Sequence, residues 1–141
     1  MGDKTFAEHF LKLEGRLNRL RYLKRILVLM AIGAVIGAVS GVIFHADSSE
    51  FEIIMLIMSF CMMAPQYCLA VRRLHDMNKN ENIAQFYLCC GLANNIIILL
   101  NLESLETFAL ALSVIVTVLA IYFLVMPGTR GANNYGPDPL A

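Results

Sequence analysis

Four long apolar stretches, joined by short polar links, constrain this sequence more than any other feature. They cover residues 26–44, 53–71, 83–100 and 107–126, and none of them contains Asp, Glu, Lys, Arg or His. An α-helix rises 1.5 Å per residue, so about 20 apolar residues cross the hydrocarbon core of a bilayer. A soluble helix would carry a polar face, which residues 26–44 and 107–126 lack. We therefore predict four transmembrane spans.

The composition indicates the same class of protein. Of the 141 residues, 58% are hydrophobic and 16% are charged, whereas a soluble domain carries about 25% charged residues. The 11 basic residues are balanced by 11 acidic ones, which argues against a generally basic protein that binds nucleic acid. Because the links are short, neighbouring spans must be antiparallel. The predicted fold is an all-α, integral membrane four-helix bundle, in which residues 1–141 form a single membrane domain.

The placement of the charges predicts the orientation of this bundle. Every Lys and Arg lies in the leader (residues 1–25), in the middle link (72–82) or in the tail (127–141). The first and third links contain only acidic charged residues. Cytoplasmic segments of membrane proteins are enriched in Lys and Arg. We therefore expect both termini and the middle link to be cytoplasmic.

Within the leader, apolar residues recur at a helical spacing. The series consists of Phe6, Phe10, Leu13, Leu17 and Leu20. Steps of four and three residues place such side chains in one stripe on a helix, and basic residues follow the same spacing beside it. This pattern predicts an N-terminal amphipathic helix at the headgroup boundary, with its cations towards anionic lipid. The alternative is a basic flank that only directs topology.

Three motif blocks occur in order along the chain. They read Gly15-Arg16-x-x-Arg19-x-x-Tyr22, then Arg72-Arg73-Leu74-His75-Asp76, then Asn133-x-Tyr135-Gly136-Pro137-Asp138-Pro139. In these blocks the chain resembles the bacterial inner-membrane family known as domain of unknown function 805, the YhaH-like proteins. The resemblance implies a small multi-pass protein of the bacterial cytoplasmic (inner) membrane, and it implies no reaction, because the activity of the family is unassigned.

The predicted topology brings these blocks to the cytoplasmic ends of the spans, where their charged side chains would form one cluster. Its members are Arg16, Arg19, Arg72, Arg73, His75, Asp76 and Asp138. In a structural interpretation, Asp76 and Asp138 pair with arginines and close a cap, because guanidinium groups suit carboxylates. In a functional interpretation, the surplus arginines and His75 bind a phosphate, an anionic lipid headgroup or a protein partner. The sequence leaves both open.

Small residues recur within the first span. Gly33, Gly37 and Gly41 are four residues apart, and this spacing allows two helix backbones to approach closely in a membrane. The partner helix is either another span of the same chain or a second copy, which would make a homo-oligomer.

We predict a non-enzymatic binding or scaffolding protein whose arginine-rich cytoplasmic face engages anionic membrane lipid or a membrane protein partner. The alternative is a small oligomeric channel or transporter lined by the first and third spans. An enzyme acting on lipid or phosphate, with His75 as general base, is a third possibility. No nucleophile or set of metal ligands accompanies His75, so we expect no catalytic residue, no cofactor and no metal.

Overall fold

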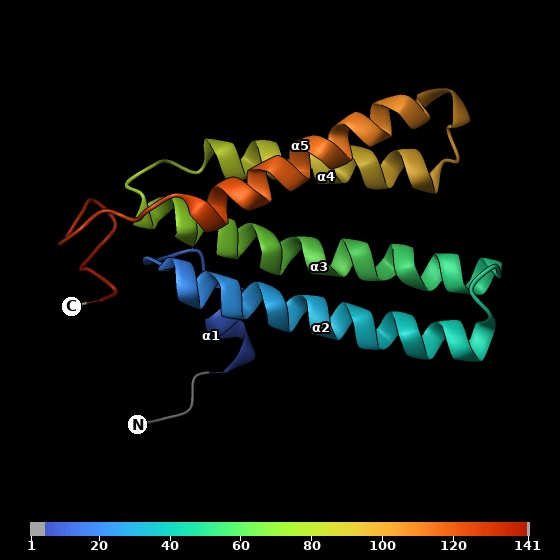
Figure 1. Ribbon diagram of the computed structural model, residues 1–141, viewed down its shortest axis with the longest axis horizontal. Helices are drawn as coiled ribbons and strands as arrows, with labels where there is room; N and C mark the ends of the chain where they lie inside the picture. Colours follow the sequence, from blue (N-terminus) through green and yellow to red (C-terminus); the bar gives the residue numbers. More distant parts are fainter. Residues whose placement is uncertain (1–4, 141) are drawn as a thin grey trace.

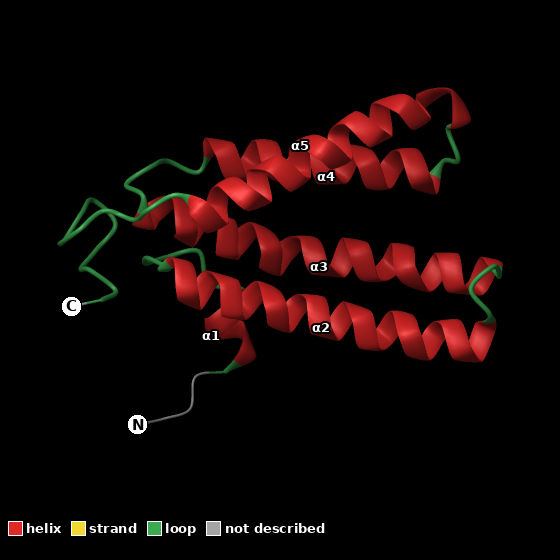
Figure 2. Ribbon diagram, in the orientation of Figure 1, coloured by secondary structure: helices red, strands yellow, loops and turns green. Residues whose placement is uncertain are grey.

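The computed structural model describes residues 5–140, and over that range it is all-helical apart from one isolated β-bridge. Four long helices follow one another, and each predicted span falls on one of them (Figure 1, Figure 2). They are α2 (Arg19–Phe44), α3 (Ser49–Asp76), α4 (Asn82–Leu99) and α5 (Glu106–Val125). A short helix, α1 (Phe6–Phe10), precedes them, and a 3-10 turn, η1 (Glu103–Leu105), leads into α5.

The four long helices are long and apolar enough to cross a membrane. Large apolar side chains remain exposed along them; for example, Val42 is 82% exposed and Leu110 66% exposed. An apolar surface of this extent is unfavourable in water, whereas lipid tails solvate it. The fold is therefore that of a multi-pass membrane protein.

Two helices begin or end outside the predicted spans. α2 begins at Arg19 because the side chain of Asn18 caps it, accepting a hydrogen bond of 2.8 Å from the backbone N–H of Arg21. α3 begins after a similar cap at Ser48 and continues to Asp76, so residues 72–76 are helical and the middle link is shorter than predicted. α3 ends where Asn78 adopts a left-handed backbone conformation, with φ of 56°.

The leader differs more strongly from its prediction, because it does not form one amphipathic helix. α1 ends at Phe10, and a loop of residues 11–18 follows before α2 begins. Gly15 interrupts helix formation here with φ of +84°. Phe10 and Leu17 are buried in the protein, whereas the other three members of the predicted stripe are exposed. Residues 1–4 of the predicted leader lie outside the described residues.

The best-packed part of the molecule lies at one end of the bundle. There the leader loop (11–18), the last turn of α3 (72–76) and the segment after α5 (126–140) lie together, and we call these three segments the cap (Figure 1). A buried cluster joins Leu17 and Leu74 of the cap to Leu69 of α3 and Phe123 of α5. α2 packs on α3, α3 on α4 and α4 on α5, while α5 diverges from α2 towards the other end of the bundle (Figure 1).

Candidate functional site

Asp76, in the last turn of α3, is the centre of the cap. One carboxylate oxygen accepts a hydrogen bond of 3.1 Å from Nε of Arg16 and lies 3.1 Å from Nη2 of the same side chain. The other lies 2.5 Å from Nη1 of Arg73, one turn earlier on α3. All three side chains are almost completely buried. Two guanidinium groups and one carboxylate therefore form an internal ion cluster, in which mutual attraction offsets the cost of burying each charge.

Each arginine of this cluster also binds backbone carbonyl groups that a helix end or a loop leaves unpaired. Arg73 donates to the carbonyl oxygens of Phe123, at 2.7 Å, and of Met126, at the end of α5. The last carbonyls of a helix have no intrahelical partner, and a buried cation satisfies them. Arg16 donates to the carbonyl oxygens of Thr129 and Gly131, both at 2.6 Å. Arg16 and Arg73 therefore hold the leader, α3 and the tail together.

The tail also docks on α3 through its own side chains. Thr129 donates to the carbonyl oxygen of Asp76 from its backbone N–H, at 2.8 Å, and from its hydroxyl, at 3.0 Å. Asn133 donates to the carbonyl oxygen of His75 at 2.9 Å. The ring of Tyr135 stacks on the imidazole of His75, with centroids 3.9 Å apart. His75 also contacts the leader, because its Nδ1 donates to the carbonyl oxygen of Gly15 at 3.3 Å. These contacts hold His75 in place between the leader and the tail.

The structure separates the predicted cluster into two groups. Arg16, Arg73, His75 and Asp76 lie together inside the cap. Arg19 is exposed on the first turn of α2, and Arg72 lies on a different side of α3 from Arg73, where it faces α1. Asp138 does not pair with an arginine as predicted: it accepts backbone N–H groups of Gly131, at 2.8 Å, and Leu140, at 2.9 Å.

A second basic site, which the sequence did not indicate, lies between α1, α2 and α3. Nη2 of Arg25 donates to Nδ1 of His9 at 3.1 Å, and Nη1 of Arg72 donates to the carbonyl oxygen of His9, also at 3.1 Å. Sequence reasoning counted Arg25 only as a topology signal. Nothing in the sequence relates it to His9, 16 residues earlier, because the turn after α1 brings the two together.

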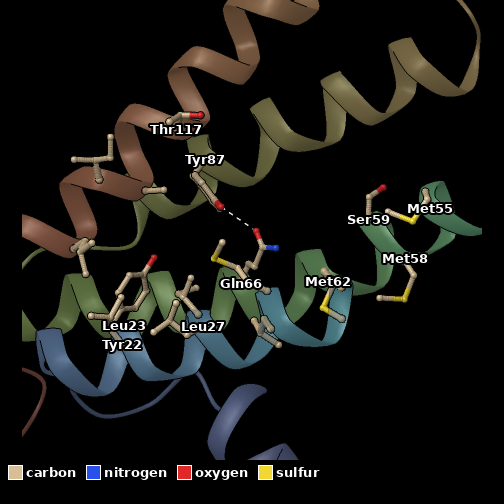
Figure 3. Close-up of a pocket in the computed structure, with 17 residues that line it drawn as sticks. Tyr22, Leu23, Leu27, Met55, Met58, Ser59, Met62, Gln66, Tyr87 and Thr117 are labelled. Carbon is tan, nitrogen blue, oxygen red and sulfur yellow. Dashed lines mark hydrogen bonds between the residues drawn. The ribbon is translucent and has the colours of Figure 1, made fainter. Parts of the chain in front are cut away.

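An apolar groove of about 540 Å³ opens between α2, α3 and α5, with Tyr87 of α4 at its floor (Figure 3). Three of its polar side chains donate hydrogen bonds within the protein. Tyr87 donates to Gln66 at 3.0 Å, Ser59 to the carbonyl oxygen of Leu56 at 2.7 Å, and Thr117 to that of Ser113 at 2.8 Å. The groove therefore presents mainly hydrocarbon, and the Tyr22 hydroxyl and the Gln66 amide are its remaining polar groups.

The three glycines of the first span have different surroundings. A Cβ atom at Gly37 would lie 3.5 Å from Met55, and one at Gly41 would lie 3.6 Å from Phe51, so both glycines face α3 of the same chain. A Cβ at Gly33 would meet nothing within 4 Å, because Gly33 lines the groove. The close helix approach is thus made within the chain at Gly37 and Gly41.

A smaller polar pocket of about 350 Å³ lies at the cap end of this groove. Its wall includes Arg19 and Leu20 of α2, Gly128 and Arg130 of the tail, and Asp138. Asp76 also contributes to the wall, but its charge is balanced by Arg16 and Arg73. Within residues 5–140 neither Arg19 nor Arg130 has a carboxylate within ion-pair distance.

Four membrane-length apolar helices, closed at one end by a buried ion cluster, define the chain as a multi-pass membrane protein. Comparison with protein families matches residues 10–137 to the family described as Protein of unknown function (DUF805). The chain belongs to this family, which confirms the resemblance seen in the sequence motifs. The search of the curated proteins found no match, and the search of the solved structures found none.

Proposed function

We propose that the protein is a non-enzymatic protein of the bacterial cytoplasmic membrane that binds an anionic lipid headgroup at the cap end of its spans, through Arg25 and Arg72. The distribution of Lys and Arg supports a cytoplasmic location for the cap. The observation that carries the proposal is the convergence of these two guanidinium groups on His9 without a carboxylate.

The electrostatics of the Arg25–Arg72 site favour an anion. Within the described residues, 5–140, no carboxylate lies within ion-pair distance of either side chain. Nη1 of Arg25 and Nε of Arg72 are also buried and make no hydrogen bond in the protein. A guanidinium group only donates, so His9 accepts through Nδ1 and supplies no negative charge. Both side chains are partly exposed, and two neighbouring cations without a counter-ion gain strongly from a phosphate, whose oxygens suit the guanidinium fork.

The position of the site favours lipid over a protein partner. Arg25 directly precedes the apolar run that begins at Ile26, which places it at headgroup depth. The adjoining leader exposes Phe6, Leu11 and Leu13, which are between 44% and 54% exposed. Apolar side chains beside basic ones are typical of segments that lie in the membrane interface. The cap arginines contribute little to such binding, because Arg16 and Arg73 are occupied within the protein.

Lipid retention in native mass spectrometry tests this proposal. Wild-type protein from micelles that contain equal amounts of phosphatidylglycerol and phosphatidylcholine should retain phosphatidylglycerol preferentially. An arginine near a membrane surface contributes about 1 kcal/mol to attraction of anionic lipid, so Arg25→Gln and Arg72→Gln should each weaken the preference about fivefold. Arg21→Gln, at an exposed position one helix turn before Arg25, is the control for the loss of a positive charge near the site. If the double variant keeps the wild-type preference, the anionic-lipid proposal is wrong and a protein partner becomes the candidate ligand.

A further inference from the structure

The groove has the length of one membrane leaflet. On α2 it extends from Tyr22 to Gly33, and on α3 from Met55 to Gln66. At 1.5 Å per residue, either interval corresponds to about 16 Å, which is about half of the 30 Å hydrocarbon core of a bilayer. Its volume of about 540 Å³ is within the range of about 300–1,000 Å³ that is typical of ligand sites.

The chemistry of the groove suits an alkyl chain. Most of its lining is aliphatic or thioether side chain, and Ser59, Tyr87 and Thr117 already donate to acceptors within the protein, so a polar solute would find few groups to replace its hydration. The same feature disfavours a path for ions, since membrane pathways for ions use ionisable or otherwise unsatisfied polar groups. Figure 3 shows the side chains of Leu23 and Leu27 on α2 and of Met62 on α3 lining this space.

The residues that line the polar pocket lie next to those of the groove along the chain, on α2 and after α5. Arg19 lies on the same face of α2 as Tyr22, Ile26 and Gly33, at successive spacings of three, four and seven residues. On the opposite wall, Leu124 lines the groove, and Gly128 and the segment after it line the pocket. A chain lying in the groove would therefore bring its polar end to Arg19. Arg25 is on another side of α2, so this pocket is separate from the Arg25–Arg72 site.

The charges of the pocket have both signs. Arg19 and Arg130 have no carboxylate partner within residues 5–140. Asp138 accepts two backbone N–H groups, and these hydrogen bonds lower the pKa of its carboxyl group and keep it ionised at neutral pH. Two cations and one anion complement a headgroup that joins a phosphate to an ammonium group.

We propose that the groove and the polar pocket together bind one zwitterionic phospholipid of the leaflet at the cap end, with an acyl chain along α2 and α3, its phosphate at Arg19 and Arg130, and its ammonium group at Asp138. This inference is independent of the proposed anionic-lipid site, since it uses other residues and another lipid class. The bound lipid would occupy the space through which a channel or transporter would carry its solute.

Filling the groove tests the position of the acyl chain. The chain has five Tyr and no Trp, so in the background Tyr67→Phe/Tyr122→Phe/Tyr135→Phe the tyrosine fluorescence comes from Tyr22 and Tyr87, which line the groove. Phosphatidylethanolamine brominated on one acyl chain should quench this fluorescence more strongly than brominated phosphatidylcholine at equal content in nanodiscs. Gly33→Leu places its side chain in the open groove, and it should abolish this difference. Ala31→Leu, at an exposed position of α2 outside the groove, should keep it.

Changing the pocket tests the headgroup. Arg19→Gln with Arg130→Gln should reduce the affinity for phosphatidylethanolamine about tenfold, because the phosphate loses both cations. Asp138→Asn should remove the preference for phosphatidylethanolamine over phosphatidylcholine, and Arg21→Gln is the control. If Gly33→Leu leaves the quenching difference intact while the thermal unfolding of the variant is unchanged, the proposal is wrong. It is also wrong if phosphatidylglycerol replaces phosphatidylethanolamine with equal affinity. Either failure leaves the Arg25–Arg72 result unaffected, so the two proposals fail separately.

Discussion

The cap and the groove are held together in different ways. In the cap, Asp76, Arg16 and Arg73 are almost completely buried, and each bonds to several partners from different segments. Along the groove, α2 and α5 diverge, and the hydrogen bonds are local ones such as Tyr87 to Gln66 and Thr117 to the carbonyl oxygen of Ser113. A directional ion cluster specifies one arrangement of the leader, α3 and the tail, whereas the apolar walls leave room for hydrocarbon. The comparison indicates a well-packed end that positions helix termini and a lateral opening that we propose as a lipid site.

Removal of the Asp76 charge should cause the largest decrease in the free energy of unfolding among the changes predicted for the cap and the groove. Asp76→Asn preserves the volume of the side chain but leaves Arg16 and Arg73 buried without a counter-ion. The loss of one partner of a buried ion cluster costs about 3–5 kcal/mol, so we expect a decrease of that size in the free energy of unfolding in detergent micelles, measured by denaturant titration and circular dichroism.

The control is Glu14→Gln, which removes the exposed Lys12–Glu14 pair at 3.7 Å. An exposed pair contributes about 0–1 kcal/mol, so this variant should unfold almost as the wild type does. Similar losses in the two variants would show that the cap cluster does not hold this end of the bundle together.

Two glycines allow a matched comparison of the two regions. A Cβ at Gly128 would overlap the carboxylate of Asp76, whereas a Cβ at Gly33 meets open space. Gly128→Ala must displace Asp76 or the tail, and overpacking of this kind costs about 1–3 kcal/mol. Gly33→Ala should be neutral or stabilise α2 by about 0.5–1 kcal/mol, because alanine loses less backbone entropy than glycine in a helix.

Thermal unfolding of the two alanine variants in the same detergent checks this prediction. The opposite order of stability, with Gly33→Ala the weaker protein, would mean that the groove is closed by packing and that the cap tolerates an added methyl group. That result would contradict both halves of the comparison.

The sequence predicted the spans well because hydrophobicity is a local property, and the absence of charge over each stretch is sufficient to identify it. The prediction of one helix for the leader was wrong because the structure of this segment is not a local property. Its apolar spacing satisfies a helix, but Gly15 and the burial of Phe10 and Leu17 against α3 and α5 depend on tertiary contacts. The residue type of Gly15 was a signal in the sequence, because glycine readily adopts a positive φ and so favours the end of a helix.

The hydrogen-bond partners of single arginines in the site also depend on tertiary contacts that the sequence does not show. Arg72 and Arg73 are adjacent and chemically identical, yet one helix step of about 100° turns Arg73 towards Phe123 and Arg72 towards His9. The sequence places both at the same end of the bundle, but only the packing of α1 and α5 assigns their partners. Asp138 was predicted to pair with arginine, although an aspartate next to glycine and proline residues frequently binds nearby backbone N–H groups, as it does here.

The smallest effect should come from Asp138, which holds the tail by hydrogen bonds and not by burial. The backbone N–H of Leu140, and then that of Gly131, lower the pKa of its carboxyl group below the usual value. Because the pKa in the folded state lies below that in the unfolded state, this contact stabilises the tail fully above the unfolded value and is lost as pH falls through the folded value. The amide ¹H shifts of Gly131 and Leu140 should therefore titrate with a midpoint below about 3.9, the ordinary pKa of aspartate. In Asp138→Asn these shifts should not titrate, while the free energy of unfolding stays close to that of the wild type because the Asp76 cluster is unchanged. A midpoint at or above the ordinary value would show that the tail amides do not bind the carboxylate, and these amides would then no longer fix the position of Asp138 in the polar pocket.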